Sequence, residues 1–235
     1  MIGSPARRDW QVATATLFRQ ETAKVKSIKF ETTAWAGHLA GQHVDIRLTA
    51  DNGYQAERSY SIASPAGCGP HVELTVERIS DGEVSPFLTD ELRIGDAIEL
   101  RGPIGGYFAW APGTLSPLML IAGGSGVVPL MSMLRTRHQA GRKIPANLLY
   151  SSRSAEDIIY RDELDRLAAN RDGFHLVHTL TRGAPCGMAG PDSAGRQRHA
   201  RPVRFPARRE ASDLRMWPDR IRGNRRRPIG RPWPW

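Results

Sequence analysis

The stretch Leu120-Ile-Ala-Gly-Gly-Ser-Gly-Val-Val-Pro129 marks the point where the fold changes character. Residues 118–122 form a short unbroken apolar run, typical of a buried strand, and residues 130–139 carry apolar side chains at helical spacing. The glycine-rich turn between them favours the binding of a pyrophosphate, because free amides and the helix dipole attract negative charge. Taken alone, the pattern also fits an ordinary tight turn between a strand and a helix.

Strand and helix patterns alternate downstream of this turn. Residues 146–150 and 174–179 have the pattern of strands, and residues 163–169 between them have the pattern of a helix. A strand–helix–strand–helix–strand order predicts a parallel sheet of the nucleotide-binding type. We therefore expect an α/β domain over residues 116–187.

The upstream segment, residues 8–112, predicts an antiparallel β domain. Val72, Leu74 and Val76 alternate with polar residues, as in a strand with one buried face. Six such β-rich runs recur between turn residues, at positions 11–18, 25–32, 42–49, 58–62, 71–79 and 97–101. Six short strands predict a small barrel, which closes its own edges.

Arg58-Ser-Tyr-Ser-Ile-Ala-Ser64 is the first stretch of the β domain that suggests chemistry. Side chains alternate along a strand, so Arg58, Tyr60 and Ile62 would share one face. An arginine can bind a phosphate with two hydrogen bonds, a tyrosine can lie flat on a ring, and a serine can donate to a ring nitrogen. Without its context, the same stretch fits a polar edge strand.

Two further stretches follow in the β domain. Gly82-Glu-Val-Ser85 opens a short helix expected over residues 85–92, with Ser85 as its N-cap and Pro86 at its first position. Gly82 allows a close approach of the backbone, and a helix N-terminus offers free amides to a pyrophosphate. The second stretch is Gly95-Asp96, followed after one more strand by Gly102-Pro-Ile-Gly-Gly-Tyr-Phe108. Each fits an ordinary capped helix or turn when taken alone.

Taken in this order, the stretches resemble the flavin motifs of the ferredoxin–NADP+ reductase superfamily. Arg58 to Ser64 matches the motif Arg-x-Tyr-Ser-x-x-Ser, and Gly82 to Ser85 matches Gly-x-x-Ser at a helix start. The resemblance implies that the barrel binds FAD. The implied cofactor-binding residues of the barrel are Arg58, Tyr60, Ser61, Ser64, Gly82, Val84 and Ser85.

The resemblance also implies a role for some of these residues. Arg58 and Ser85 would hold the FAD pyrophosphate, Tyr60 would pack on the isoalloxazine, and Ser61 would reach the flavin N5, where hydride arrives. Tyr60 and Ser61 are therefore the candidate catalytic residues.

The glycine-rich turn is similar to the family's nicotinamide-nucleotide loop, Gly-Gly-x-Gly-x-x-Pro, through Gly123, Gly124, Gly126 and Pro129. The resemblance implies that NAD(P)H binds there.

Three later residues bear on the choice of nucleotide. Arg153 follows the second strand of the α/β domain, and Thr181 and Arg182 follow the third. These residues are similar in position to those that meet the pyrophosphate and 2′-phosphate in NADP-using members. No acid ends the second strand to hold a free 2′-hydroxyl, as NAD selection would require. The sequence favours NADPH, although merely solvated arginines would give the same pattern.

The net charge of +9 comes entirely from the last part of the chain. Residues 188–235 hold 13 arginines and four acids, whereas basic and acidic residues are equal in number before them. A basic arm for nucleic acid is the corresponding alternative, and the sequence gives no specific support for it. Cys68 and Cys186 are too few for a metal knuckle or an iron–sulfur cluster, so we expect no metal site in this chain.

The family pattern stops near Gly187, so the α/β domain is expected to be truncated and residues 188–235 to form an aberrant, disordered tail. A one-base frameshift accounts for the change. The codons of Met188 and Ala189, shifted by one base, give Trp. The codons of Met216-Trp217-Pro218, shifted likewise, give Cys-Gly, the start of the Cys-Gly-Pro…Phe-x-Glu segment that closes over the nicotinamide in the family.

Together these features predict an oxidoreductase with a β + α/β fold that carries FAD, takes hydride from NAD(P)H and passes electrons to a partner. The resemblance implies a ferredoxin, a flavodoxin or the iron–sulfur component of an oxygenase as that partner. A non-catalytic flavin-binding remnant is the alternative. No stretch has the roughly 20 apolar residues of a membrane span, and no signal peptide is recognisable, so we expect a cytoplasmic protein with no membrane partner. The oligomeric state stays open.

Overall fold

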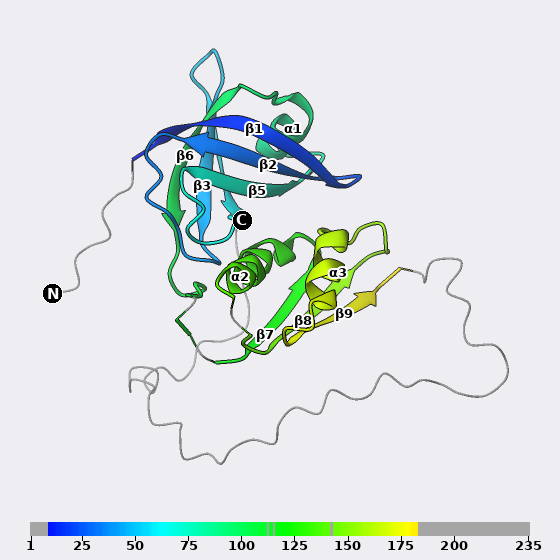
Figure 1. The fold of residues 1–235 in the computed structure, drawn as a ribbon. Helices are drawn as coiled ribbons and strands as arrows, with labels where there is room; N and C mark the ends of the chain where they lie inside the picture. The colour runs from blue at the N-terminus through cyan, green and yellow to red at the C-terminus, as the bar shows by residue number, and fades with distance from the viewer. Residues whose placement is uncertain (1–8, 112, 115, 142, 183–235) are drawn as a thin grey trace, which may run out of the picture. The chain divides into compact units, whose positions relative to one another are not determined.

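The computed structural model describes residues 9–111, 113–114, 116–141 and 143–182 (Figure 1). The first part is an antiparallel sheet of six strands, β1 (Gln11–Thr22), β2 (Val25–Thr32), β3 (His43–Thr49), β4 (Gln55–Ser61), β5 (His71–Glu77) and β6 (Ala97–Ile104). The strands lie in the order β4-β3-β6-β1-β2-β5. A bridge between Ile62 and Leu74 joins the end of β4 to β5 and closes the sheet. The predicted six-stranded barrel is therefore confirmed.

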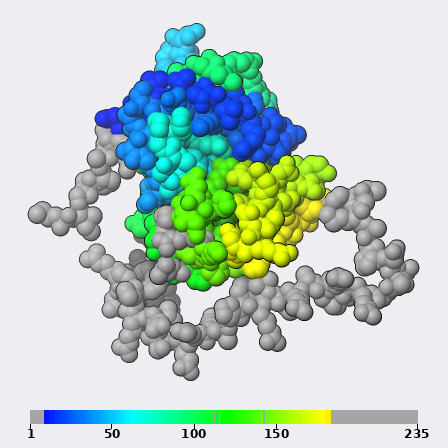
Figure 2. Space-filling model, in the orientation of Figure 1, coloured from blue at the N-terminus to red at the C-terminus, as the bar shows by residue number. Residues whose placement is uncertain are grey.

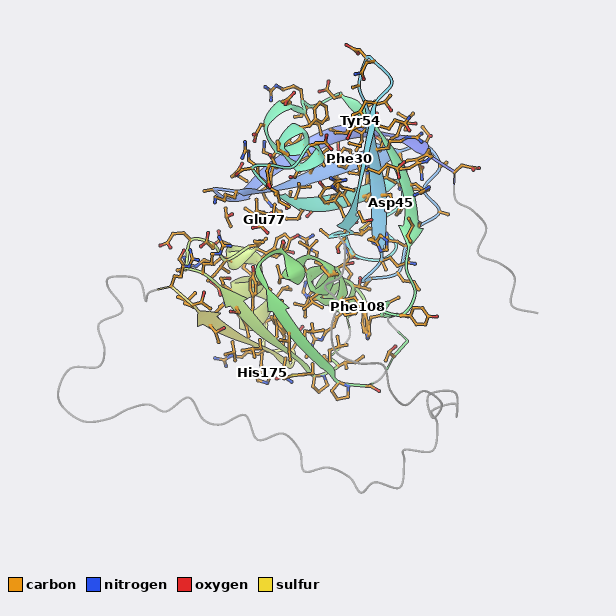
Figure 3. All side chains as sticks on the ribbon, turned by 180° about the vertical axis from the view of Figure 1, so that it is seen from behind. Phe30, Asp45, Tyr54, Glu77, Phe108 and His175 are labelled. Carbon is orange, nitrogen blue, oxygen red and sulfur yellow. The ribbon has the colours of Figure 1, made fainter. Side chains whose placement is uncertain are left out.

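The barrel interior is filled by the apolar side chains of alternating strand positions. Phe30 of β2 points into this interior, where it is fully buried (Figure 3). Val72, Leu74 and Val76 of β5 are also fully buried, as their alternation predicted. Burial of each such side chain contributes about 2 kcal/mol to the stability of the fold. Thr75 is buried as well, and its hydroxyl forms a hydrogen bond of 2.7 Å with the Ser27 hydroxyl of β2, which offsets the cost of burying a polar group.

Several strands are longer than the sequence pattern predicted, and β1 and β4 of the barrel extend through polar residues. β1 continues to Thr22, which pairs with Val25 across the turn to β2, and β4 begins at Gln55, opposite Thr49. These extensions consist largely of polar residues. They are held by the hydrogen bonds of a hairpin ladder, which hydrophobic alternation does not reveal. The described barrel residues form a continuous surface on the face seen in Figure 2.

The short helix of the barrel differs from the prediction. α1 spans Val84–Pro86 and continues as a π-helical turn over Phe87–Glu91. Glu83 occupies the N-cap and makes no side-chain capping bond, so the prediction of Ser85 as the cap is wrong. The Ser85 hydroxyl instead accepts the backbone N–H of Ile79 at 3.1 Å.

The second part is a parallel sheet of β7 (Leu118–Gly123), β8 (Ala146–Ser152) and β9 (Phe174–Leu180), paired in that order. The crossovers contain α2 (Val127–Gln139) and α3 (Arg161–Ala169), which confirms the predicted α/β domain. α2 begins earlier than predicted, and Pro129 lies in its first turn, where the missing N–H costs little.

One face of this sheet carries exposed apolar side chains. Both crossover helices lie on the other face, as two right-handed connections require (Figure 1). Met119 and Ile121 of β7 are 53% and 67% exposed, and Val177 of β9 is 46% exposed. His175 of β9 is exposed on the same face, because side chains alternate along the strand (Figure 3).

Arg135 of α2 lies at the centre of a partly buried ion-pair network. Its side chain is 10% exposed and donates to both carboxylate oxygens of Glu163 in α3, at 2.8 and 2.7 Å. It also donates to the Glu73 carboxylate and to the Ala63 carbonyl, both at 2.8 Å. Tyr160 packs beside this guanidinium, with its ring centroid 5.0 Å away.

The predicted disordered tail, residues 188–235, lies outside the described residues, as does Cys186. In the part of the chain that the structure describes, no helix is both long and apolar enough to cross a membrane. The same residues contain no group of three or more His, Cys, Asp or Glu side chains arranged to hold a metal ion.

Candidate flavin and nucleotide sites

The predicted flavin strand is β4, and its register with β3 decides which side chains share a face. Tyr60 lies opposite Val44, and Arg58 lies opposite Ile46. Val44 and Ile46 are fully buried in the barrel. Directly opposed residues of an antiparallel pair point to the same face. The predicted common face of Arg58 and Tyr60 is therefore confirmed.

The two side chains have different environments. Arg58 is exposed, and within the described residues its guanidinium makes one hydrogen bond, to the Glu57 carbonyl at 2.7 Å. Its positive charge is therefore available to an anion. Tyr60 is half-buried, and burial raises its pKa to about 12 against the opposing effect of the Arg58 charge. A cation beside a flat, neutral ring fits a pyrophosphate and a flavin ring. Ser61 is half-buried at the end of the strand.

Ser64, the last residue of the flavin motif, is buried and already bonded to the protein. Its hydroxyl accepts the backbone N–H of Glu73 at 3.2 Å. Its carbonyl accepts the hydroxyl of Ser132 at 2.6 Å and lies 3.0 Å from Nε2 of His38. These contacts fix the backbone just beyond β4. A contact of Ser64 with FAD stays a prediction.

The second flavin motif forms a tight turn before α1. The Gly82 N–H donates to the Ile79 carbonyl at 3.0 Å. A Cβ at Gly82 would lie 3.2 Å from that same carbonyl oxygen and from the Ser85 hydroxyl, so the turn leaves little room for a side chain. Val84 and Ser85 are buried in the first turn of the helix.

The glycine-rich turn is open to a ligand. Gly124 has φ +51°, a conformation that favours glycine. A Cβ at Gly123, Gly124 or Gly126 would meet nothing within 4 Å, so the space above the turn is free of described protein atoms. A dinucleotide can therefore approach the backbone closely.

The ends of β8 and β9 bring the three predicted specificity residues together. The backbone N–H of Thr181 donates to the Ser152 carbonyl at 3.0 Å, and the backbone N–H of Arg182 donates to the Arg153 carbonyl at 2.7 Å. The side chains of Arg153, Thr181 and Arg182 are exposed.

A pocket of about 390 Å³ connects the glycine turn to these strand ends. It is lined by Thr22, Lys24, Val25, Glu77, Gly123, Gly124, Ser125, Ser151, Ser152, Arg153, Asp157, Ile159 and Thr181. Of the predicted nucleotide residues it brings together Gly123, Gly124, Arg153 and Thr181. Gly126, Pro129 and Arg182 do not line it.

Among the lining residues that the sequence does not identify, Lys24 has the clearest chemical meaning. It lies in the turn between β1 and β2, and it adds a second cation to the pocket in addition to Arg153. No motif marks it, because it meets the glycine turn only through the tertiary fold.

Two family models match the chain. The oxidoreductase FAD-binding domain matches residues 15–109, and the oxidoreductase NAD-binding domain matches residues 120–190. The chain belongs to the ferredoxin–NADP+ reductase superfamily. The resemblance suggested by the flavin and nucleotide motifs is thereby confirmed.

Relatives with curated names agree with this membership. The chain is 39% identical over 163 residues to ferredoxin–NADP reductase B of Sorangium cellulosum, a match that covers 68% of this chain and 66% of that protein. It is also 39% identical over 130 residues to methane monooxygenase component C of Methylosinus trichosporium, covering 55% and 37% of the two chains. The chain thus spans about two thirds of the first relative and little more than a third of the second.

Solved structures show the same fold. The cytochrome P450 reductase GcoB of Amycolatopsis superimposes with a TM-score of 0.68 at 26% identity, over 78% of this chain and 55% of that one. A ferredoxin NADP+ reductase of Neisseria gonorrhoeae, with FAD and NADP bound, gives a TM-score of 0.64 at 23% identity, over 74% and 70%.

Proposed function

We propose that this member of the superfamily is an FAD-dependent oxidoreductase that takes hydride from NAD(P)H and passes electrons to a redox partner. One observation carries the proposal: a single pocket joins the open glycine turn, the arginine after β8 and the threonine after β9. Such a pocket at the carboxyl ends of parallel strands is where α/β sheets bind nucleotides. The preceding barrel matches an FAD-binding domain, which supplies the acceptor for hydride.

Four residues of the barrel would hold FAD and align it. Arg58, together with Ser85 in the first turn of α1, would bind the pyrophosphate. Tyr60 would pack on the isoalloxazine, and Ser61 would lie at N5. Arg58 suits this role because its charge faces solvent, and Tyr60 because its neutral ring is half-buried. When bound, FAD accepts two electrons as hydride and releases them singly, and the protein supplies orientation and electrostatics.

NADPH is the proposed nucleotide. β8 ends in Ser151 and Ser152 rather than in an acid, and Arg153 follows. An acid at this place would hold the ribose hydroxyl of NADH, whereas an arginine accommodates the 2′-phosphate of NADPH. Thr181 and Arg182, bonded to the same segment, would contact the same phosphate.

The proposed electron acceptor is a ferredoxin, a flavodoxin or the iron–sulfur component of an oxygenase. The support is the pair of relatives above, one named as a ferredoxin reductase and the other as a monooxygenase component.

Anaerobic addition of NADPH to the FAD-loaded chain tests the proposal. An oxidoreductase loses its yellow colour as the flavin is reduced, even if slowly. The alternative, a non-catalytic flavin-binding remnant, binds FAD but stays yellow with both NADPH and NADH. A chain that takes up no FAD refutes both.

A further inference from the structure

Tyr150 of β8 connects two segments that line the nucleotide pocket. Its side chain is fully buried, and its hydroxyl donates to the Gly124 carbonyl at 3.1 Å. The same hydroxyl accepts the backbone N–H of Ile159 at 3.3 Å. Gly124 belongs to the glycine turn, and Ile159 precedes α3; both line the pocket. The phenol ring packs against His178 of β9, with ring centroids 5.7 Å apart.

The bond to Gly124 fixes the orientation of one peptide plane. The Gly124 carbonyl also accepts the N–H of Val127, so both of its lone pairs are used inside the domain. A trans peptide is planar, and its N–H points opposite to its carbonyl. With the Gly124 carbonyl held toward Tyr150, the N–H of Ser125 points away from the domain interior. Ser125 lines the pocket.

We propose that Tyr150 is a positioning residue that holds the Ser125 amide ready to donate to the pyrophosphate of the nucleotide. This inference rests on the proposed function, because it takes the pocket to be the NAD(P)H site. An amide that already points at the anion costs no reorganisation when the anion binds. The pyrophosphate is common to NADP+ and NAD+, so Tyr150 acts equally on the affinity for both.

The Tyr150→Phe variant tests this role, since it removes the hydroxyl and keeps the packed ring. On the FAD-loaded chain, we expect calorimetric titration to give a Kd about five- to tenfold higher for both NADP+ and NAD+, the effect of one lost hydrogen bond. Tyr160→Phe is the matched control. This variant removes another buried tyrosine hydroxyl, which donates to the Thr75 hydroxyl. Tyr160 does not line the pocket. Tyr160→Phe should therefore lower the melting temperature as much as Tyr150→Phe does, and it should leave both Kd values unchanged.

The outcomes test the positioning role of Tyr150 and the proposed function separately. A Tyr150→Phe Kd equal to that of the wild type, or equal weakening by Tyr160→Phe, refutes the positioning role and leaves the proposed function intact. A wild-type chain that binds neither nucleotide overturns both. Amide hydrogen exchange of the wild-type chain gives a test independent of the folding of the variants. NADP+ should slow exchange at Ser125, and an unchanged rate overturns the proposal.

Discussion

Arg182 donates its backbone N–H to the carbonyl oxygen of Arg153 at 2.7 Å, so the ends of β9 and β8 are tied together at the pocket proposed to bind the nucleotide. Arg153 lines that pocket, and Arg182 does not. The sequence predicts contact with the nucleotide phosphates for both arginines, but only Arg153 lines the pocket.

The first prediction follows from this difference. Arg153→Ala should weaken the binding of NADP+ by about tenfold, because a hydrogen bond to a charged group is lost. The binding of NAD+, which lacks the 2′-phosphate, should change little. Arg182→Ala should have the same selectivity with a smaller effect. Titration of the FAD-loaded variants with each nucleotide measures the four constants. Equal losses for NADP+ and NAD+ would mean that Arg153 does not contact the 2′-phosphate.

The second prediction concerns the flavin. Arg58→Ala should reduce FAD affinity more than Ser61→Ala, since it removes a charge-assisted contact to the pyrophosphate. The exposed guanidinium has one backbone hydrogen bond among the described residues, so its removal should leave the melting temperature of the apoprotein almost unchanged. Quenching of FAD fluorescence on binding gives both affinities. The role of Arg58 is wrong if Ser61→Ala is the more damaging of the two.

Much of the fold was predictable because its signals are local. The alternation of Val72, Leu74 and Val76 predicts strand β5, and the glycine turn at 123–126 predicts the change to an α/β pattern. The ends of β1 and β4 were missed, because their polar residues are held by cross-strand hydrogen bonds. Ser85 was misplaced as an N-cap for a similar reason. Its hydroxyl bonds to Ile79, outside the helix.

The site was predictable only in part. Motif spacing identified Gly123, Gly124, Arg153 and Thr181, which the structure brings to one pocket. Lys24 and the hydroxyl of Tyr150 were not identifiable. The first meets the pocket through the tertiary fold, and the second acts on a backbone carbonyl 26 residues away.

The third prediction concerns the Arg135 network. Arg135→Ala should lower the free energy of unfolding by about 3 kcal/mol, because it removes the main cation from two partly buried carboxylates. Glu73 and Glu163 then keep only the longer contacts to Arg19, at 3.4 and 3.9 Å. Arg78→Ala is the matched control. Its pair with Asp90 has partners 38% and 47% exposed, so solvent screens the pair and its loss should lower the free energy of unfolding much less than the loss of Arg135. Urea denaturation at neutral pH measures both variants.

The same network predicts a pH dependence. Burial raises the pKa of Glu163, but the hydrogen bond and charge of Arg135 outweigh it and hold that pKa below the ordinary value of 4.5. A carboxylate with a lowered pKa stabilises the fold above its unfolded-state pKa and loses that contribution as the pH falls through the folded value. The stability difference between wild type and Arg135→Ala should therefore shrink below pH 4.5. A difference that is constant down to acid unfolding would show that the pair contributes nothing through charge.

The last prediction tests the frameshift. We propose that residues 188–235 are translated out of frame, and that the other frame encodes the rest of the α/β domain. In doubly wound sheets, the chain returns to the far side of the first strand, and its later helices cover the second face. The first strand here is β7, where Met119 and Ile121 are 53% and 67% exposed on that face.

A chain restored to the other frame from codon 188 should bury this face. Its melting temperature should rise, and it should bind less of a dye that reports exposed apolar surface, because covering apolar side chains stabilises the fold by about 25 cal/mol per Å². Its rate of NADPH-dependent ferricyanide reduction should rise about 100-fold, since a displacement of ~1 Å between reactants costs about that much. A chain with Met119→Glu and Ile121→Glu in the restored frame is the control, because it keeps the restored sequence but cannot bury the face without burying charge. It should lose the gain in stability. If the chain in its present frame equals the restored one in rate and melting temperature, the frameshift proposal is wrong, and residues 188–235 are a functional part of the protein.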